Sequence, residues 1–547
     1  MRRWSLPLTV SAVVLVQLIA LPTSSSADAW APPQTTPSSV YGLSIVDPVL
    51  SFSYASELSA FSTGVNRLGS QTLCSGYSVS GPCQFDAPGT SLYGDILLPV
   101  CNTDVETNCV AGMSLGTSAD SLQPSTFVRM TNGPTVAADP ARGLPEGSTI
   151  GLWSSSLANA GGTTTYATYA IVQVAYGAGH YSLTNVTAAV LPYAQVSGAY
   201  QTPVDVQTVN PTDGRTLTGV LGPIPGCAWT ETGICGRLQD FQTGTVASMT
   251  VRLSNQIGGW FKGRLQNPTL SVQPFDSSSN SITVTAQTVP VPQLTVAVPI
   301  ASATPTVQTY FKGLMGDGPT GGWQLFADDS RSFQATDMLR STANDTASGV
   351  VNTWSFGSFA ATGNSCLTDT SHVLGLVTTN SMVYDNQAPT FSNGYLSYQV
   401  AGMHYLPDDS LALGTYDMII ADSVARCLYG YSSAPISASV SVTESSGVDN
   451  VATTSVTDVG GWLRLSANGF TFSDPTISVK LTQAAAKSKT TPITCAKGTN
   501  VKRVTGVSPR CPAGYRARTT IKCTRGTNVK RVTGVSPRCP AGYKRKS

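Results

Sequence analysis

Short runs in which apolar and polar residues alternate recur along this chain of 547 residues. Successive side chains of a β-strand point to opposite faces of its sheet, so a period of two predicts a strand. Turn sequences rich in Gly, Pro, Asn and Asp separate these runs. The pattern predicts an all-β protein of sandwiches or open barrels. We expect strands at Thr164–Val174, Val246–Leu253, Ser281–Gln287, Ile436–Val442 and Thr476–Leu481.

Long helices are not expected in the central part of the chain. Between Trp30 and Ala486 there are only three lysines and five glutamates, residues that usually cover the exposed face of a helix. This part has about 455 residues, which exceeds one usual domain, so we expect two or three β-sandwich-like domains. The proline-punctuated stretch Val289–Pro305 is the first predicted boundary.

The resulting domain organisation has six parts. They are a signal peptide (1–29), an N-terminal β region of one or two domains (30–295), a C-terminal β-sandwich domain (306–483), a linker (484–490) and two small basic repeats (491–518 and 519–547).

Two Gly-Gly-Trp segments resemble each other on either side of the first boundary. The segment that ends at Trp260 is followed by Asn267–Val272, and the one that ends at Trp462 is followed by Asp474–Val479, which has similar letters. This similarity suggests a divergent duplication. Each tryptophan either packs behind a last core strand or stacks on a sugar ligand, and we favour packing because aromatic side chains usually serve it.

The N-terminus has the form of a secretory signal peptide. Two arginines precede an apolar stretch at residues 6–21, and small residues follow, ending in Ala27-Asp28-Ala29. The apolar stretch is short for a membrane anchor, the alternative interpretation, and the letters after the arginines fit a twin-arginine signal poorly. We expect cleavage near Trp30 and secretion, with no later segment that spans a membrane.

Twelve cysteines agree with an oxidising compartment. Ten of them form close couples and two are left for each other, although spacing alone leaves other connectivities open. Zinc sites need closely spaced cysteines or histidines, and the chain has three histidines. We therefore predict no metal site and six disulfides: Cys74–Cys83, Cys101–Cys109, Cys227–Cys235, Cys366–Cys427, Cys495–Cys511 and Cys523–Cys539.

The net charge of +2 hides two oppositely charged parts. Residues 487–547 contain sixteen Lys and Arg and no Asp or Glu, a charge of +16, whereas residues 30–486 contain 14 basic and 29 acidic residues, a charge of −15. Such an asymmetry predicts a partner with dense negative charge.

The basic part repeats itself. Gly498–Tyr515 and Gly526–Tyr543 have the same eighteen letters, and each copy contains the predicted strand Asn-Val-Lys-Arg-Val-Thr. A unit this small buries little core, so a disulfide is its expected staple. Two copies raise affinity through effective concentration. We predict that an anionic polymer binds Lys497, Lys502, Arg503, Arg510, Arg525, Lys530, Arg531 and Arg538.

Three partners fit such a module: an anionic cell-wall polymer, membrane phospholipid, or nucleic acid. No nucleic acid is expected, because the chain is predicted to be exported and aromatic residues are not interleaved with the cations. A solvated tail that only aids solubility is the remaining alternative.

Catalytic motifs are weak. Gly112-Met113-Ser114-Leu115-Gly116 matches a nucleophile elbow but lacks a preceding apolar strand and a following helix. His180, His372 and His404 stand in no recognisable frame, and no nucleotide-binding glycine pattern implies a cofactor. Paired carboxylates of a glycosidase are possible at Asp328-Asp329 and Asp408-Asp409. A calcium loop is possible at the alternating Asn102, Asp104 and Glu106.

The tail resembles a short basic C-terminal module of diverse secreted actinobacterial proteins. The resemblance rests on the pattern I-T-C-x-K-G…K-x-V-T-x-V-x-P-x-C-P-x-G-Y-K at Ile493–Tyr515 and Ile521–Lys544. The segment from Ala425 through Trp462 to Leu481 resembles exported actinobacterial proteins without an assigned activity. These resemblances imply secretion and association with a bacterial envelope, but no reaction.

The sequence thus favours a secreted, non-catalytic structural or binding protein. Its β-domains would be displayed at the surface, and its tandem tail would bind an anionic cell-wall polymer of the teichoic-acid kind. The alternative is a secreted hydrolase of polysaccharides that the tail targets. The two differ in geometry, because a hydrolase requires a cleft that collects catalytic side chains. The oligomeric state stays open.

Overall fold

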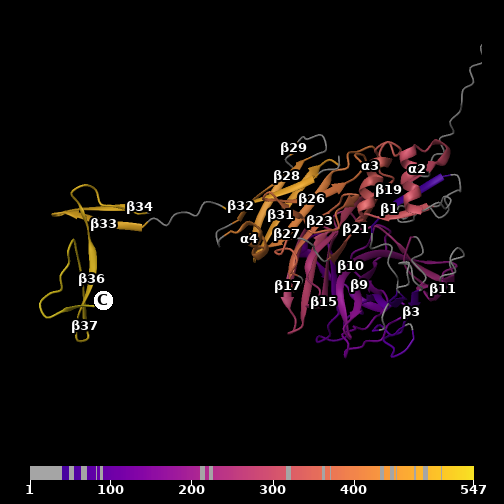
Figure 1. Cartoon of the computed structure of the whole chain (residues 1–547), viewed down its shortest axis with the longest axis horizontal. Coiled ribbons are helices and arrows are strands. Elements are labelled where there is room, and N and C mark those ends of the chain that lie inside the picture. Colours follow the sequence, from indigo (N-terminus) through magenta and orange to yellow (C-terminus); the bar gives the residue numbers. More distant parts are fainter. Residues whose placement is uncertain are drawn as a thin grey trace, which may run out of the picture. The chain divides into compact units, whose positions relative to one another are not determined.

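A computed structural model describes residues 40–47, 55–62, 71–81, 83–86, 90–209, 216–220, 226–315, 322–359, 364–369, 371–431, 436–443, 449–450, 453–472, 476–483, 491–506 and 508–546. The predicted signal peptide and the predicted linker at 484–490 lie outside these residues. The chain divides into two compact units, a body that runs to Thr482 and a tail unit that begins at Gln483 (Figure 1).

The body is built around one large mixed sheet. Fifteen of the described strands belong to it, eleven along one path and four attached at its side. The path runs β3 (Gln71–Leu73), β2 (Glu57–Ser62), β4 (Thr90–Leu97), β9 (Thr165–Gly177), β10 (His180–Ser197), β22 (Ser355–Phe359), β16 (Gly259–Arg264), β23 (Val373–Thr379), β27 (Gly414–Ala421), β31 (Trp462–Phe470) and β30 (Thr453–Val459). The attached strands are β7 (Thr126–Met130), β8 (Gly151–Ser154), β13 (Cys227–Glu231) and β14 (Ile234–Leu238).

Smaller sheets accompany the large one. A five-stranded sheet contains β17 (Gln266–Pro274), β18 (Ser279–Gln287), β15 (Val246–Ser254), β5 (Cys109–Gly116) and β6 (Gln123–Pro124). A six-stranded sheet contains β24 (Val383–Tyr384), β25 (Thr390–Ser392), β26 (Tyr395–Ala401), β32 (Thr476–Gln483), β28 (Ile436–Thr443) and β29 (Asp449–Asn450). A four-stranded sheet contains β20 (Gly322–Phe326), β1 (Val40–Val46), β19 (Val289–Pro299) and β21 (Gly349–Thr353), and a two-stranded one contains β11 (Asp205–Val209) and β12 (Thr216–Val220).

These sheets confirm the all-β prediction, and each of the five predicted strands is present, as β9, β15, β18, β28 and β32. Other strands escape the alternation rule because both of their faces are buried. β22 and β23 are buried along their whole length. A strand covered on both faces has no polar side to alternate with its apolar one, so its sequence carries no period of two.

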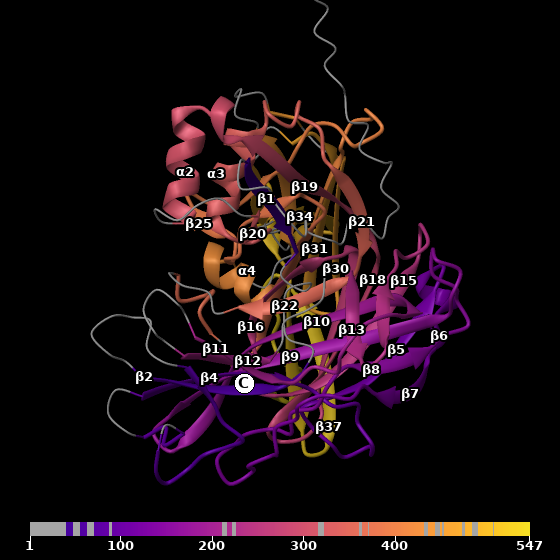
Figure 2. The ribbon, with the colours of Figure 1, turned by 90° about the vertical axis from the view of Figure 1, so that its right-hand side faces the viewer.

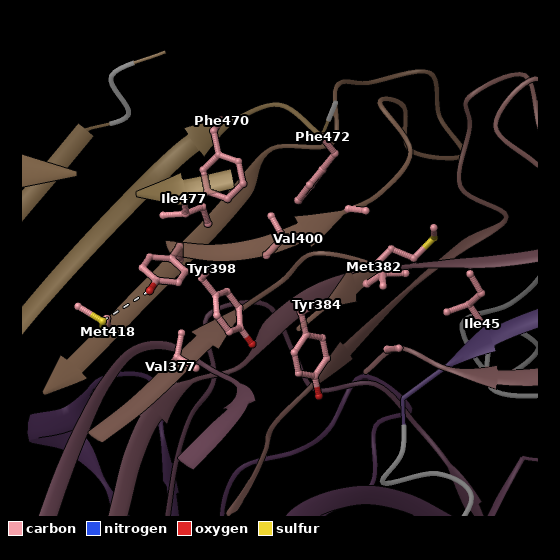
Figure 3. Close-up of a cluster of buried hydrophobic side chains, with 14 of the residues drawn as sticks. Ile45, Val377, Met382, Tyr384, Tyr398, Val400, Met418, Phe470, Phe472 and Ile477 are labelled. Atoms are coloured by element: carbon pink, nitrogen blue, oxygen red, sulfur yellow. Dashed lines mark hydrogen bonds between the residues drawn. The ribbon is translucent and has the colours of Figure 1, made fainter. Parts of the chain in front are cut away.

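Three hydrophobic cores cover the faces of the large sheet, and the third packs β9 and β10 against β13, β14 and parts of β19 and β21. On β16, Trp260 belongs to the first core and Phe261 to the second, as the alternation of side chains requires. The first core joins the large sheet to the four- and six-stranded sheets, and Figure 3 shows part of it, including Tyr384 and Tyr398. The second joins the large sheet to the five-stranded sheet. The body is therefore layered, with strands in the middle of the large sheet such as β22 and β23 buried along their whole length.

The boundary expected between residues 295 and 306 falls inside this architecture. Strands from both sides of it join the large sheet, and β19 crosses it as a paired strand. Residues 289–293 of β19 pair with β21, and residues 294–299 pair with β1. Pro290 and Pro292 are tolerated because β21 is the one partner of that stretch, which leaves the other side of the strand free of a ladder.

Three α-helices occur in the described residues, none longer than 11 residues: α2 (Pro305–Met315), α3 (Ser330–Leu339) and α4 (Asp422–Tyr429). The same described residues contain two single 3₁₀ turns, at Ala119–Ser121 and Ile300–Ser302. Proline at the first position of α2 suits a helix start, since that residue needs no hydrogen-bond donor. α2 and α3 lie side by side near β1 (Figures 1 and 2), and the Tyr310 hydroxyl donates a hydrogen bond to the Arg331 carbonyl oxygen at 2.9 Å.

All six predicted disulfides are present. Five close loops of 8 to 16 residues, whereas Cys366–Cys427 spans 61 residues and ties α4 to the segment before β23. No helix in the described part of the chain is long and apolar enough to cross a membrane.

A buried ion pair joins three segments at the centre of the body. Arg264, at the end of β16, is 1% exposed, and its Nε donates to Asp47 Oδ1 at 2.7 Å. Its Nη atoms donate to the carbonyl oxygens of Thr379, Ser381 and Met382. Because Asp47 follows β1 and the carbonyls lie at the end of β23 and directly after it, one guanidinium fixes the four-stranded sheet to the large sheet.

We expect replacement of Arg264 by Met to destabilise the body by about 3–5 kcal/mol, since it leaves a buried carboxylate without its cation. Urea unfolding of the full chain measures this loss. Arg331→Met is the matched control, because its pair with Asp329 is more than half exposed on the arginine side and contributes about 1 kcal/mol or less. Equal losses in the two variants would contradict the structural importance of the buried pair.

Candidate anion-binding surface

Each basic repeat forms a three-stranded antiparallel sheet with a central first strand. In the first repeat, β33 (Thr491–Lys497) lies between β34 (Asn500–Gly506) and β35 (Arg516–Ala517). In the second, β36 (Thr519–Arg525) lies between β37 (Asn528–Gly534) and β38 (Lys544–Lys546). β34 and β37 contain the two predicted hairpin strands. The register is the same in both copies, with Cys495 opposite Lys502 and Cys523 opposite Lys530.

The hairpins turn through the dipeptide Gly-Thr, which follows Lys497 or Arg525. Gly498 has φ of +60° and Gly526 has φ of +59°. Glycine adopts a positive φ without steric cost, and this position of a two-residue hairpin loop favours it. The sequence of the repeat thus determines where each strand reverses.

The tail unit has almost no apolar core. Its buried apolar residues are Cys495, Ala496, Ile521 and Cys523. The disulfides Cys495–Cys511 and Cys523–Cys539 tie the central strand of each sheet to the returning segment. A core this small contributes little hydrophobic free energy, so these covalent links are the main constraint on each fold.

All eight predicted ligand-binding cations are exposed, six on strands of the two sheets and Arg510 and Arg538 in the segments that return to them. The unit contains no carboxylate side chain that could neutralise them. Lys502 Nζ lies 5.3 Å from the ring centroid of Tyr515, and Lys530 Nζ lies 5.1 Å from that of Tyr543. Such cation–π contacts orient the ammonium groups but leave them solvated and available to an anion.

Six further cations among the described residues of the tail unit were not predicted, although the absence of acidic residues already indicated that all its charged residues are basic. Five of them are exposed and Arg518 is half-buried, with its Nη2 donating to the Thr533 carbonyl oxygen at 3.4 Å. The six are Arg516, Arg518, Lys522, Lys544, Arg545 and Lys546.

Cations lie on both faces of each small sheet. In β34, Lys502 shares a face with Cys495, whereas Arg503 shares the other face with Thr494 and Val501. Val501 is 52% exposed, so the second face is not a core. A flat membrane surface meets one face of a module, but a flexible chain of anions can contact both.

The predicted catalytic residues form no common site. Ser114 lies inside the continuous strand β5, opposite Ser248, so the nucleophile elbow is absent at this position. His180 begins β10 and is exposed. His372 Nδ1 lies 2.8 Å from Ser371 Oγ in an exposed local turn.

His404 belongs to a structural ion-pair cluster. Its Nδ1 lies 2.5 Å from Asp345 Oδ2, and Arg340 Nη1 lies 2.9 Å from Asp345 Oδ1. Burial raises the pKa of Asp345, but hydrogen bonds from His404 and the Arg340 charge outweigh burial and leave that pKa below its ordinary value. Arg340 also donates to the carbonyl oxygens of Gly402 and Phe472, which links separate loops.

The paired carboxylates expected from the sequence do not form a catalytic pair. Asp329 caps α3 by accepting a hydrogen bond from the Arg331 backbone N–H at 2.8 Å, whereas Asp328 pairs with Lys262 at 2.5 Å. Asp408 accepts from Ser410 in a turn, as the preceding proline suggested.

In the suggested calcium loop, a carboxylate accepts a hydrogen bond from the loop's own backbone. The Asn102 backbone N–H donates to Glu106 Oε2 at 2.6 Å. Within the described residues, no group of three or more His, Cys, Asp or Glu side chains is placed to hold a metal ion.

The two tryptophans of the repeated segment differ in exposure. Trp260 is completely buried, which agrees with packing and excludes it as a platform for a ligand. Trp462 is partly buried and packs against the second core. Both segments then leave the large sheet, β16 for the five-stranded sheet through β17 and β31 for the six-stranded sheet through β32.

We expect the double variant Cys495→Ser, Cys511→Ser to unfold the first repeat. A disulfide closing a loop of this length contributes about 3 kcal/mol, more than so small a core can replace. Limited trypsin digestion followed by mass spectrometry should show cleavage at Lys502 and Arg503, while the second repeat, an internal control with its own disulfide, resists. Equal resistance of both repeats would show that the disulfide is dispensable.

In the described residues, the charged side chains of the tail unit are all cationic, and the predicted catalytic residues of the body do not form a common site. No protein-family model, curated protein or solved structure matches this chain.

Proposed function

We propose that this is a secreted protein that attaches to an anionic polymer of the cell envelope through its tail unit. The observation that supports this function is the set of exposed cations on two stapled sheets that contain no acidic residue. The body would be displayed at the cell surface as a structural or binding part.

Export is supported by chemistry as well as by the N-terminal pattern. Six disulfides, including two in units that have almost no core, persist in an oxidising compartment and not in a reducing one. The resemblance of the tail to a module of secreted actinobacterial proteins agrees with the surface of a bacterium.

A polymer with repeated negative charge suits this unit better than a compact ligand. Single exposed ion pairs contribute only about 0.2–1 kcal/mol each, so useful affinity requires many of them. Two copies with the same register at a spacing of 28 residues present the same cations twice. Once one repeat is bound, the other meets the polymer at a high effective concentration.

The test is cosedimentation with purified Gram-positive cell walls over a range of salt concentrations. We expect replacement of Lys502, Arg503, Lys530 and Arg531 by Gln to weaken binding by a factor between about four and about a thousand, since four exposed contacts are lost. Salt should release the original protein, because exposed charges are screened. A chain that ends at Ala486 should not sediment with the walls.

A matched control removes four exposed, uncharged hydroxyl groups from the same unit: Thr499, Ser508, Thr527 and Ser536 replaced by Ala. This variant should bind like the original. Walls stripped of teichoic acid identify that polymer if binding is lost. Undiminished binding by the chain that ends at Ala486 would sink the proposal and place attachment in the body.

A further inference from the structure

The body contains a polar pocket that none of the predicted sites includes as a whole. It has a volume of about 270 Å³ and lies against the large sheet where β9, β10, β22 and β16 run side by side. Its polar wall includes Asp47, Gln173, Asn185, Lys262, Asp328 and Gln387. These residues come from five separate regions of the chain, so no local sequence pattern predicts that they share a pocket.

Two carboxylates stand at the same edge of the pocket for a topological reason. β1 and β20 are parallel neighbours, with Val46 opposite Phe326. Asp47 follows the carboxyl end of β1, and Asp328 lies two residues after the end of β20. Carboxyl ends of parallel neighbours meet at one sheet edge, which is also where open sheets commonly place ligands.

The charges of the pocket are balanced internally. Asp328 pairs with Lys262 at 2.5 Å, and Asp47 pairs with Arg264 beneath the pocket at 2.7 Å. An anion or a cation that entered would have to break one of these pairs, each of which is mostly buried. The pocket therefore suits a ligand without net charge.

Two hydrogen-bond acceptors at the pocket lack a donor. Asp47 Oδ2 and Asn185 Oδ1 are buried and have no hydrogen-bond partner among the described residues. The Asp47 side chain is 4% exposed, and Asn185 is fixed by a 3.0 Å hydrogen bond from its Nδ2 to Gln173 Oε1. A buried acceptor without a donor costs about 1–3 kcal/mol. Both oxygens are closed to solvent in this structure, so a ligand hydroxyl would remove that cost after a small rotation of either side chain opens its oxygen to the pocket.

The apolar part of the wall is aromatic. Phe359 and Tyr384 both line the pocket and belong to the first core. Figure 3 shows the Tyr384 hydroxyl turned away from Val400 and Phe472 of that core. Lys262 Nζ lies 5.7 Å from each of the two ring centroids, so the rings and the cation form one surface.

From these features we propose that the pocket binds one unit of a neutral saccharide. A saccharide ring offers several hydroxyl donors to the unpaired acceptors and acceptors to the amide and ammonium donors, and its C–H groups suit aromatic side chains. The volume of about 270 Å³ lies just below the roughly 300–1,000 Å³ range of small-molecule pockets, which fits one ring better than an oligosaccharide.

Binding fits this geometry better than hydrolysis. Glycoside hydrolysis requires one carboxyl group that donates a proton to the leaving oxygen. Here each of the two carboxylates faces a cation, so the pair serves to hold Lys262 and Arg264 in place. The pocket is independent of the tail unit and of its proposed anionic ligand.

The test is saturation-transfer NMR and calorimetric titration of the full chain with glucose, mannose, galactose, N-acetylglucosamine and arabinose. Glucuronic acid serves as the charged arm and glycerol as the small polyol arm. We expect at least one neutral sugar to bind with an affinity that does not depend on salt. Asn185→Ala should weaken this binding about tenfold, the effect of a lost hydrogen bond of about 1.4 kcal/mol.

Gln387→Ala, at the exposed rim, provides a second variant that leaves the buried wall intact and should weaken binding severalfold. Asn255→Ala is the matched control outside the pocket and should bind like the original, as should the tail variant with four neutralised cations.

Several results would overturn the proposal. The first is that none of the five neutral sugars binds, and the second is that Asn185→Ala and Gln387→Ala both bind the sugar as tightly as the original protein. The others are a preference for glucuronic acid and binding of glycerol as tight as that of the sugars. Each of these leaves the cell-wall sedimentation result unaffected, so the two proposals fail separately.

Discussion

The buried pair of Arg264 and Asp47 is the contact on which the arrangement of the body depends. Removing two charges from water costs several kcal/mol per ion, and their attraction offsets that cost only with good geometry and further hydrogen bonds. Arg264 meets this condition through the carbonyl oxygens at the end of β23 and directly after it. We interpret the pair as a device that selects one docking of the four-stranded sheet on the large sheet, and the polar pocket opens beside that junction.

Charge separates the two proposed binding surfaces. The body is acidic, but its pocket balances carboxylates against cations, whereas the tail unit has only cations. Electrostatics would therefore direct an anionic polymer to the tail unit and leave the pocket of the body to a neutral saccharide. Attachment of the tail to a wall polymer would also hold the body at a high local concentration of envelope sugars, so weak recognition in the pocket would suffice.

Local patterns predicted the features that depend on neighbouring residues. Alternation identified β9, β15, β18, β28 and β32, and four of these five strands belong to the smaller five- and six-stranded sheets. Cysteine spacing identified five of the disulfides, because short loops bring their ends together at small entropic cost, and the sixth joins the two cysteines that remained. The same patterns predicted a boundary at residues 295–306, since the prolines of β19 resembled a linker, although their stretch of the strand pairs on one side alone and accommodates them.

The sequence by itself determined the all-β class, the stapled repeats and the concentration of positive charge in the tail, because each of these follows from composition or from residues close along the chain. Tertiary structure alone decided that Asp47, Asn185, Lys262 and Asp328 line one pocket. Asp47 and Asp328 stand 281 positions apart in the numbering and meet only because β1 and β20 pair in parallel. Pairing between distant strands depends on how whole faces pack, and such packing leaves no periodic trace in the sequence around either residue.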